Sequence, residues 1–392
     1  MIEVTCTKKI RDSKYLIIGY TITDSNNNSR YISSNELKKL IELGEISVTN
    51  LTLCSDGKLR SKRNSVKDGI TKDELKLDHV REKLIKSGFD NNWSYETPCE
   101  HYVHLYWNDK GDGVLIIPSD VKIITPYYNQ NRLIYYLGIR RQYSNQKPRF
   151  KRLKVYGGNG LESTKGLFEE CRIELIDLTD FDTQNVRDMS CMFKDCQAQL
   201  VKLTNINTSN VLDMKEMFMR CEAVVTGLWC FDTKNVEDMS YMFAGCRDNK
   251  LDLSMFDTGN VWDMSFMFAR YTGESLDLSN FRTGGVRNME SMFDSSKFES
   301  LDISKFNTYN VTNMKSMFFD MSCDSVIDLS NFDTYNLTNT EYMFGQCFVN
   351  ELKLTNFNMS NVHRYSKMFS GANIKSIELS DDTKLIAEWN KR

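Results

Sequence analysis

A motif that returns every 25 residues dominates the second half of this chain. Residues 251–268 read LDLSMFDTGNVWDMSFMF, and variants of this stretch recur from about residue 154 to the C-terminus. A fixed period of this length predicts a solenoid, in which one supersecondary unit stacks on copies of itself. The clearest marker is the Phe of each closing Met-Phe pair, which falls at Phe193, Phe218, Phe243, Phe268, Phe293, Phe318, Phe344 and Phe369, after an earlier copy at Phe168.

Each repeat contains one segment with the alternation of a β-strand. In LDLSNF, the apolar Leu276 and Leu278 flank the polar Asp277, and Phe281 follows. Apolar residues two positions apart indicate a strand with one buried face, and the Phe would fill the core behind it. We therefore expect one strand in every repeat, stacked in parallel on its neighbours.

The other half of each repeat reads Asn-Val-x-x-Met-x-x-Met-Phe. Apolar residues three apart favour a short helical or 3₁₀ turn, and Met suits the irregular spaces of a stacked core. The recurring Asn is predicted to form an internal ladder of buried amides that bond backbone groups where the chain turns. Its members are Asn185, Asn210, Asn235, Asn260, Asn310, Asn336 and Asn361, with Gly285 in the one gap.

The segments LDLSMFDTGNVWDMSFMF and LDLSNFDTYNLTNTEYMFGQC resemble the BspA-like leucine-rich repeat family. The resemblance covers about residues 154–380, which is over half of the chain. It implies a leucine-rich-repeat solenoid over 151–380, with about nine repeats and with parallel strands on the concave face. It also implies a role in adhesion and protein recognition at cell surfaces, and no catalytic activity. Residues 381–392 are expected to form a short helix that caps the last repeat.

The first 150 residues predict two small α/β units, at 1–65 and 66–150. The first has a strand near 15–23, a helix from the capping box at Ser33 to Gly44, and a strand at 46–53. It resembles small N-terminal domains of phage and mobile-element proteins. In the second we expect a helix at 77–86, a hairpin of 101–107 with 114–118 that turns at 110–113, and strands at 121–125 and 132–139.

Charge is distributed unevenly along the chain. The overall net charge is −3, and residues 1–150 carry about +6, so the remainder carries about −9. The N-terminus lacks the features of a signal peptide, and no apolar run is long enough to span a membrane. Together with 11 Cys, which agree with a reducing compartment, these observations predict a cytoplasmic protein without a membrane partner, in the host cell if a phage encodes it.

Five cysteines share one repeat position, three residues after the Phe. A metal or disulfide column is one interpretation, and small buried core residues are the other, because Tyr271, Ser296, Met321 and Ala372 take the same place elsewhere. Of the four His, His101 and His104 are expected on opposite faces of a strand and so do not converge on a metal, and no nucleophile, zinc or phosphate-binding pattern is present. We therefore predict that the protein is not an enzyme and has no cofactor or metal. The five are Cys171, Cys196, Cys221, Cys246 and Cys347.

The residue between the two strand leucines is acidic in many copies. Stacked acidic residues form a like-charge column, which we call the acidic strip, and a protein partner with a basic surface would complement it. Two alternatives remain: the acids are part of the repeat scaffold and accept hydrogen bonds from nearby Ser, or they bind Ca²⁺. The strip comprises Asp177, Asp252, Asp277, Asp302, Asp328 and Glu378.

Two further groups of residues are candidate contacts. Trp262, Tyr309 and Tyr335 stand at variable repeat positions and are predicted to be exposed. Trp229 replaces the strand Ser or Thr, and Tyr271 replaces the Cys. All five are candidate partner contacts, because Trp and Tyr are over-represented at interfaces. A basic segment with interleaved tyrosines is typical of nucleic-acid binding, and a solvated basic edge is the alternative. This basic strip comprises Arg132, Arg140, Arg141, Lys147, Arg149, Lys151, Arg152 and Lys154.

The sequence therefore predicts a non-enzymatic protein-interaction module that binds a protein through the solenoid. In its sharper form the hypothesis is a phage-encoded inhibitor of a host nucleic-acid-handling defence protein, of the anti-CRISPR type. The alternatives are a nucleic-acid-binding protein that uses the basic strip, and a surface adhesin of the BspA-like type.

Overall fold

The structure is a computed structural model of the whole chain. It describes the backbone of residues 2–11, 17–24, 29–33, 37, 46–48, 51–53, 59–61 and 93–96, and residues 104–108, 110–117, 119, 121, 122, 124, 151–247, 251–273 and 276–392. The chain forms two compact units, Met1–Glu96 and Thr97–Arg392.

The first unit contains two small sheets. Strands β1 (Ile2–Arg11), β2 (Ile17–Asp24), β3 (Ser29–Ser33) and β4 (Ile46–Val48) form a sheet in the order β3-β2-β1-β4, in which β1 is antiparallel to β2 and parallel to β4. Strands β5 (Leu51–Leu53) and β6 (Leu59–Ser61) pair antiparallel, and β7 (Trp93–Glu96) follows. The predicted helices at 33–44 and 77–86 lie outside the described residues, apart from Leu37, which is helical.

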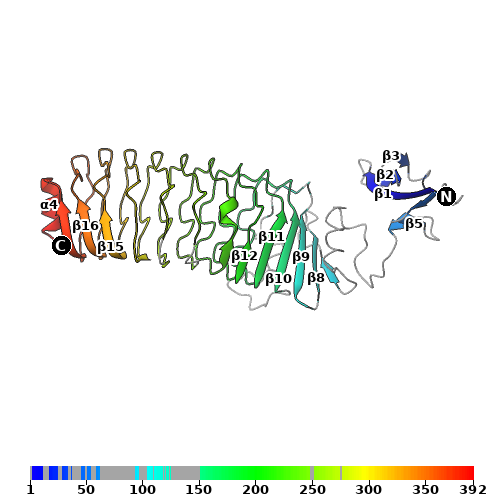
Figure 1. Cartoon of the computed structure of the whole chain (residues 1–392), viewed down its shortest axis with the longest axis horizontal. Coiled ribbons are helices and arrows are strands. Elements are labelled where there is room, and N and C mark those ends of the chain that lie inside the picture. The colour runs from blue at the N-terminus through cyan, green and yellow to red at the C-terminus, as the bar shows by residue number, and fades with distance from the viewer. Residues whose placement is uncertain are drawn as a thin grey trace. The chain divides into compact units, whose positions relative to one another are not determined.

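The second unit opens with the predicted hairpin. Strands β8 (His104–Asn108) and β9 (Asp112–Ile117) pair antiparallel around a turn in which Gly111 has a φ of 83°. Strand β9 then pairs in parallel with β10 (Arg152–Gly157), the first strand of the solenoid, so the hairpin extends the solenoid sheet (Figure 1). The strand predicted at 121–125 is wrong at the residues described there, 121, 122 and 124, which are not in a strand, and the strand predicted at 132–139 lies outside the described residues.

The strand side of the solenoid is a parallel β-sheet in two sections (Figure 1). The first continues from β10 through β11 (Leu175–Phe181), β12 (Leu200–Lys202) and β13 (Val224–Thr226). The second comprises β14 (Lys297–Phe298), β15 (Ser322–Asp328), β16 (Phe348–Leu354) and β17 (Asn373–Leu379). The repeats are thus a parallel β-solenoid, as the period predicts.

The prediction of one strand per repeat is wrong in the middle of the solenoid. Among the described residues between β13 and β14 there is no strand, although Leu276 and Leu278 are buried and Asp277 is exposed, as the alternation requires. The break begins at Gly227, whose φ of 98° leads out of β13 into the 3₁₀ helix η1 (Leu228–Cys230). Burial alternates with period 2 whether or not a strand ladder forms, so the sequence pattern could not separate the two cases.

The predicted helical turn in the return half is also wrong. Each repeat there makes a series of turns with non-Gly residues in the left-handed region, such as Tyr241 at φ 58° and Arg220 at φ 51°, and a residue at positive φ cannot continue a right-handed helix. Alternate N–H groups donate to the next repeat, as Tyr241 does to the Ser265 carbonyl at 2.8 Å. A ladder of bridges from Ser163 to Arg364 passes through nine positions and so marks about nine turns.

The solenoid core is a set of side-chain columns. Nine phenyl rings, one from each repeat from Phe168 to Phe369, stack with centroids 5.3–6.0 Å apart and planes within 14° of parallel. The Met side chains of the return half are buried beside them. Offset stacking of this kind adds to the free energy gained from burying the rings.

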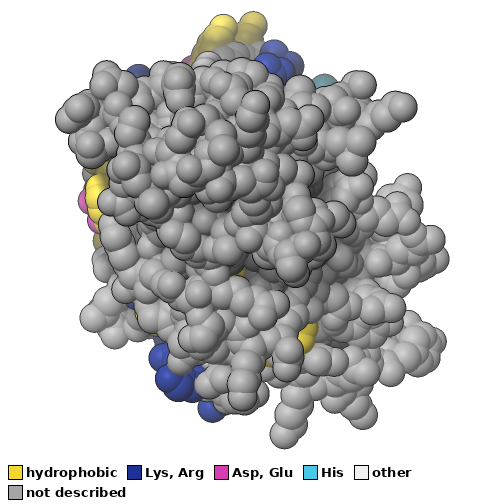
Figure 2. Space-filling model, turned by 90° about the vertical axis from the view of Figure 1, so that its right-hand side faces the viewer, with side chains coloured by type: hydrophobic (Ala, Val, Ile, Leu, Met, Phe, Trp, Pro, Cys, Tyr) yellow, Lys and Arg dark blue, Asp and Glu magenta, His cyan; other side chains and the backbone are white. Residues whose placement is uncertain are grey.

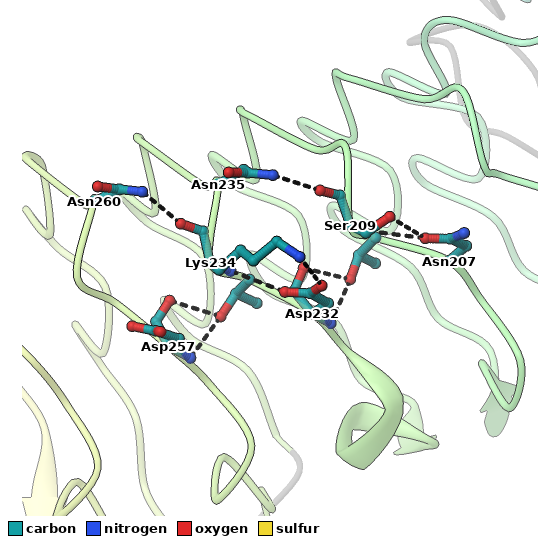
Figure 3. Close-up of polar contacts among 9 residues, drawn as sticks. Asn207, Ser209, Asp232, Lys234, Asn235, Asp257 and Asn260 are labelled. Carbon is teal, nitrogen blue, oxygen red and sulfur yellow. Dashed lines mark hydrogen bonds and ion pairs between the residues drawn. The ribbon is translucent and has the colours of Figure 1, made fainter.

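The predicted Asn ladder is present, but its location was predicted wrongly. The amides lie at an exposed or half-buried corner, where each donates to a backbone carbonyl of the preceding repeat: Asn235 to Ser209 and Asn260 to Lys234, both at 2.7 Å (Figure 3). A second, buried ladder is formed by Thr. The Thr233 hydroxyl donates to the Asp257 carbonyl at 2.9 Å and accepts from the Asp257 N–H at 2.8 Å.

Gly285 interrupts the corner ladder, and Gly285→Asn is expected to stabilise the protein by about 1 kcal/mol. A Cβ at this position would lie 3.1 Å from the Gly259 carbonyl oxygen, which is the acceptor that an Asn amide would use. The variant would gain one hydrogen bond and would lower the conformational entropy of the unfolded chain. Chemical denaturation checks this. Gly285→Ala is the control, and equal stability of the two variants would contradict the ladder bond.

The last repeat is covered by helix α4 (Thr383–Trp389), at the C-terminal end in Figure 1. Its N-cap Asp382 accepts from the N–H groups of Lys384 and Leu385, and its second oxygen accepts from the Met359 N–H at 2.8 Å. Met359 stands where the other repeats carry the ladder Thr, and the cap residue ties its backbone to the helix. Trp389 packs edge-on against Phe369.

Candidate interaction surface

The acidic strip contains four exposed carboxylates in successive repeats: Asp252, Asp277, Asp302 and Asp328. Each accepts a hydrogen bond from the backbone N–H of the Ser two residues later, at 2.9–3.1 Å. In the first, the Ser254 hydroxyl donates to the same Asp252 oxygen at 2.6 Å. The scaffold role left open by the sequence is therefore real, because these bonds hold the local turn.

The same bonds keep the four carboxylates charged. Hydrogen bonds from Ser254, Ser279 and Ser330 side chains lower the pKa of Asp252, Asp277 and Asp328, and the Ser304 N–H lowers the pKa of Asp302. Within the described part of the chain, none of the four forms an ion pair. The row is thus a fixed series of negative charges without local counter-charges in contact.

The two ends of the strip are different. Asp177 is half-buried and lies 3.9 Å from the Lys154 ammonium, and Glu378 lies 3.5 Å from the Lys353 ammonium. Lys202 and Gly227 separate Asp177 from the central row in the repeat order. Among the described residues, the strip carboxylates without an ion pair are therefore the central four, which we call the central row, although Lys305 and Lys353 act on Asp302 and Asp328 from a greater distance.

Four of the five aromatic candidates are exposed. Trp229 is 56%, Trp262 46%, Tyr309 50% and Tyr335 66% exposed. Tyr309 and Tyr335 share one repeat position in neighbouring repeats, at the corner that carries the Asn ladder. Trp229 lies elsewhere, in η1 at the end of the strand side. The structure therefore does not gather these side chains into one cluster.

The predicted partner contact Tyr271 is not exposed. Its side chain is fully buried and packs edge-on against Phe268, in the slot that Cys occupies in other repeats. The backbone at Gly273 makes the room, because a Cβ there would overlap the Tyr271 ring. A Gly two residues after an oversized core residue was the sequence signal for this arrangement.

The basic strip is described only at its end. Arg132, Arg140, Arg141, Lys147 and Arg149 lie outside the described residues. Lys151 lies 3.5 Å from Glu174, Arg152 2.6 Å from Asp112 and Lys154 3.0 Å from Asp180. Figure 2 shows Lys and Arg side chains at the lower edge of its view of the described residues. Lys151, Arg152 and Lys154 each lie next to a carboxylate, so their charges are partly neutralised within the chain.

The structure reveals a second column of acids that the sequence analysis overlooked. Asp188, Asp213, Asp238 and Asp263 occupy successive rungs of the bridge ladder and are half-buried, and Asn288 continues the column. Asn288 donates to both Asp263 oxygens at 3.2 Å. The signal was the Asp two residues after each Val of the Asn-Val motif, which the sequence analysis treated as a variable position.

Asp213→Asn is expected to raise the free energy of unfolding at pH 7 by about 0.5–1 kcal/mol, because it relieves like-charge contact along this column. Burial, then Asp188 and Asp238, raise the pKa of Asp213 in the folded state. A raised carboxyl pKa destabilises the fold above that pKa, and the penalty disappears as pH falls toward the unfolded value of 3.8.

Thermal denaturation from pH 7 to pH 4 tests this prediction. The Tm gain of Asp213→Asn should shrink as the pH falls, and a constant gain would contradict it. The control is Asp252→Asn in the central row, where the lowered pKa predicts a loss of stability at pH 7. That contribution is present above the unfolded pKa and is lost as pH falls through the folded pKa.

The shared cysteine position is a core position. Cys171, Cys196, Cys221, Cys246 and Cys347 are buried and are not in disulfides, and burial raises the pKa of Cys171 to about 12. Such thiols are unreactive near neutral pH. Among the described residues, no group of three His, Cys, Asp or Glu could hold a metal ion, and no helix there has the length and apolar character needed to cross a membrane.

Comparison with known proteins places the repeats in a family. A family model described as "Mycoplasma protein of unknown function, DUF285" matches residues 162–281 and 263–381, which together span more than half of the chain. No curated protein and no solved structure matches the chain. The matched segments coincide with the solenoid and its bridge ladder, so the chain belongs to the family described as Mycoplasma protein of unknown function, DUF285.

Proposed function

We propose that the solenoid is a non-enzymatic interaction module that binds a protein partner with a basic surface through the acidic strip. The observation that carries the proposal is the central row: four exposed carboxylates in successive repeats, each fixed by a Ser and none ion-paired within the described residues. Like charges at the repeat spacing of about 4.8 Å repel one another, so a cationic partner would relieve a cost that the free protein bears.

The central row favours fast and selective association with an oppositely charged partner. Charges on a rigid stack do not lose side-chain freedom when they bind, and a row of one sign steers an oppositely charged partner. Mobile surface acids would bind more weakly because ordering them costs entropy. Four successive repeats carry an Asp-x-Ser unit at the strip position without a break.

The narrower form of the proposal concerns the identity of the partner. A basic surface that normally contacts nucleic-acid phosphates offers the complementary charge, and a solenoid that occupied it would inhibit the protein, as phage-encoded inhibitors of the anti-CRISPR type do. Such a partner would be met in the cytoplasm of the host cell. The resemblance to BspA-like leucine-rich repeats supports recognition by the solenoid, and it supports a surface adhesin as the competing form.

The experiment is an affinity capture from nuclease-treated host lysate, followed by affinity measurement with the purified captured protein. We expect the dissociation constant to rise at least about tenfold when Asp252, Asp277, Asp302 and Asp328 are all replaced by Lys, because reversed charges repel a basic surface. The control replaces four other exposed acids by Lys, which gives the same change in net charge: Glu299, Asp320, Asp324 and Asp381. Equal losses in the two variants would overturn the strip as the site.

A further inference from the structure

Because the repeats share one pattern, each surface residue can be compared with the residues at the same position in the other repeats. Trp229 and Met255 differ from the residues at their positions. Trp229 stands where other repeats carry a Thr or Ser, such as Thr204 and Ser254. Met255, in the next repeat, stands where four repeats carry an Asn: Asn205, Asn280, Asn331 and Asn356. Both replacements exchange a small polar side chain for a large apolar one that is more than half exposed, 56% and 60%.

The Met255 replacement works against the fold. In the other repeats the Asn at this position donates to a backbone carbonyl of the preceding repeat: Asn331 to Ser304 and Asn356 to Ser330, both at 2.7 Å, and Asn280 to Ser254. A thioether has no N–H and cannot donate to the corresponding carbonyl of Trp229. The chain therefore gives up a ladder bond and exposes apolar area at the same point.

Trp229 is presented by a local change of backbone. Leu228 takes the buried place of the second strand leucine, and η1 replaces the rest of the strand around Trp229. Gly227, at the strip position of this repeat, has no side chain to cover the ring. The next repeat carries Asp252, the first residue of the central row, so the two apolar side chains adjoin the low-numbered end of that row.

We propose that Trp229 and Met255 form an apolar anchor site at this end of the central row, and that it receives a protein segment in which a large apolar side chain is followed by a row of Lys or Arg. The inference rests on the proposed function and adds the composition and direction of the segment. A basic segment is the complementary partner, because the four adjoining carboxylates have no ion-pair partner among the described residues.

The stacking distance sets the length of the segment. Three steps from Asp252 to Asp328 and one more from Trp229 cover about 19 Å at about 4.8 Å per step. An extended chain covers this distance in about six residues at about 3.3 Å each. The anchor then supplies buried apolar area at one end, and the carboxylates supply orientation along the rest.

The test uses two synthetic peptides and the full chain. The anchored peptide has two leucines followed directly by four lysines, which matches the length of about six residues, and the control peptide has serines in place of the leucines. We expect the anchored peptide to bind the wild type about tenfold more tightly. Trp229→Ser with Met255→Asn restores the repeat residues, so this double variant should fold and should remove the tenfold difference without changing the affinity for the control peptide.

Three outcomes would overturn the inference. Equal affinities of the two peptides for the wild type would mean that the acidic strip binds the lysines but that Trp229 and Met255 do not act as an anchor. Trp262 is an exposed aromatic residue at another position. If Trp262→Ser also removed the tenfold difference between the peptides, the difference would not depend on Trp229 and Met255 in particular. Concentration-dependent association of the wild type alone, absent from the double variant, would assign the surface to a second copy of this chain. If neither peptide binds, or if reversing the central row changes nothing, the proposed function fails as well.

Discussion

Phe268→Ala is expected to lower the free energy of unfolding by about 3–5 kcal/mol, the usual cost of removing a buried phenyl ring. The Phe268 ring is fully buried and stacks between Phe243 at 5.9 Å and Phe293 at 6.0 Å, measured between ring centroids. Tyr271 and Phe281 contact it from the sides. No single neighbour can fill the space, because each ring is held by the next repeat.

The effect should also be local. In a solenoid each repeat contacts only its neighbours. A destabilised repeat therefore weakens the coupling between the repeats before it and the repeats after it. We expect hydrogen exchange of amides near Phe268 to accelerate more than that of amides near Phe369, and the denaturation curve to broaden. Phe268→Leu is the matched control and should cost less than half as much. A loss below about 1 kcal/mol for the alanine variant would contradict tight packing of the column.

The buried face of the solenoid could be predicted closely from the sequence. The Phe column, the Met of the return half and the alternating leucines are all buried, because a 25-residue period leaves one inward direction for each position. The hairpin of β8 and β9 could also be predicted, since Gly111 lies in a turn between two apolar segments. In these cases the pattern reports burial directly.

The backbone conformation between the core positions could not be predicted. The left-handed residues of one turn position include Cys191, Glu216, Tyr241 and Phe266, and no shared residue type reveals them. Inter-repeat hydrogen bonds hold these residues in place, and such bonds exist only once the repeats are stacked. The same holds for the Asn ladder, whose recurrence was visible but whose exposed location depends on which way the corner turns.

The candidate site was predicted in part for a similar reason. The central row was found because Asp alternates with core leucines, and its exposure follows from that alternation. The anchor residue Met255 was not singled out, because an exposed Met looks like one more core filler until its ladder position is known. The comparison that reveals it is with the Asn of the other repeats, and it needs the hydrogen bonds that those Asn make.

Thr233→Val is expected to cost about 2–4 kcal/mol, although it changes the shape of the side chain little. The buried Thr233 hydroxyl donates to the Asp257 carbonyl at 2.9 Å and accepts from the Asp257 N–H at 2.8 Å, beside the corner shown in Figure 3. Valine would leave both backbone groups without a partner in a place that excludes water, and each such group costs about 1–3 kcal/mol.

Thr233→Ser separates the hydroxyl from the methyl group. It keeps both hydrogen bonds and removes one buried carbon, so it should cost about 1 kcal/mol. Equilibrium denaturation of the three proteins gives the comparison. A valine variant as stable as the serine variant would mean that the Asp257 backbone finds another partner, and the Thr ladder would then be packing alone. The expected order, wild type above serine above valine, would show that the repeats are joined by buried hydrogen bonds in the stretches where no strand ladder connects them.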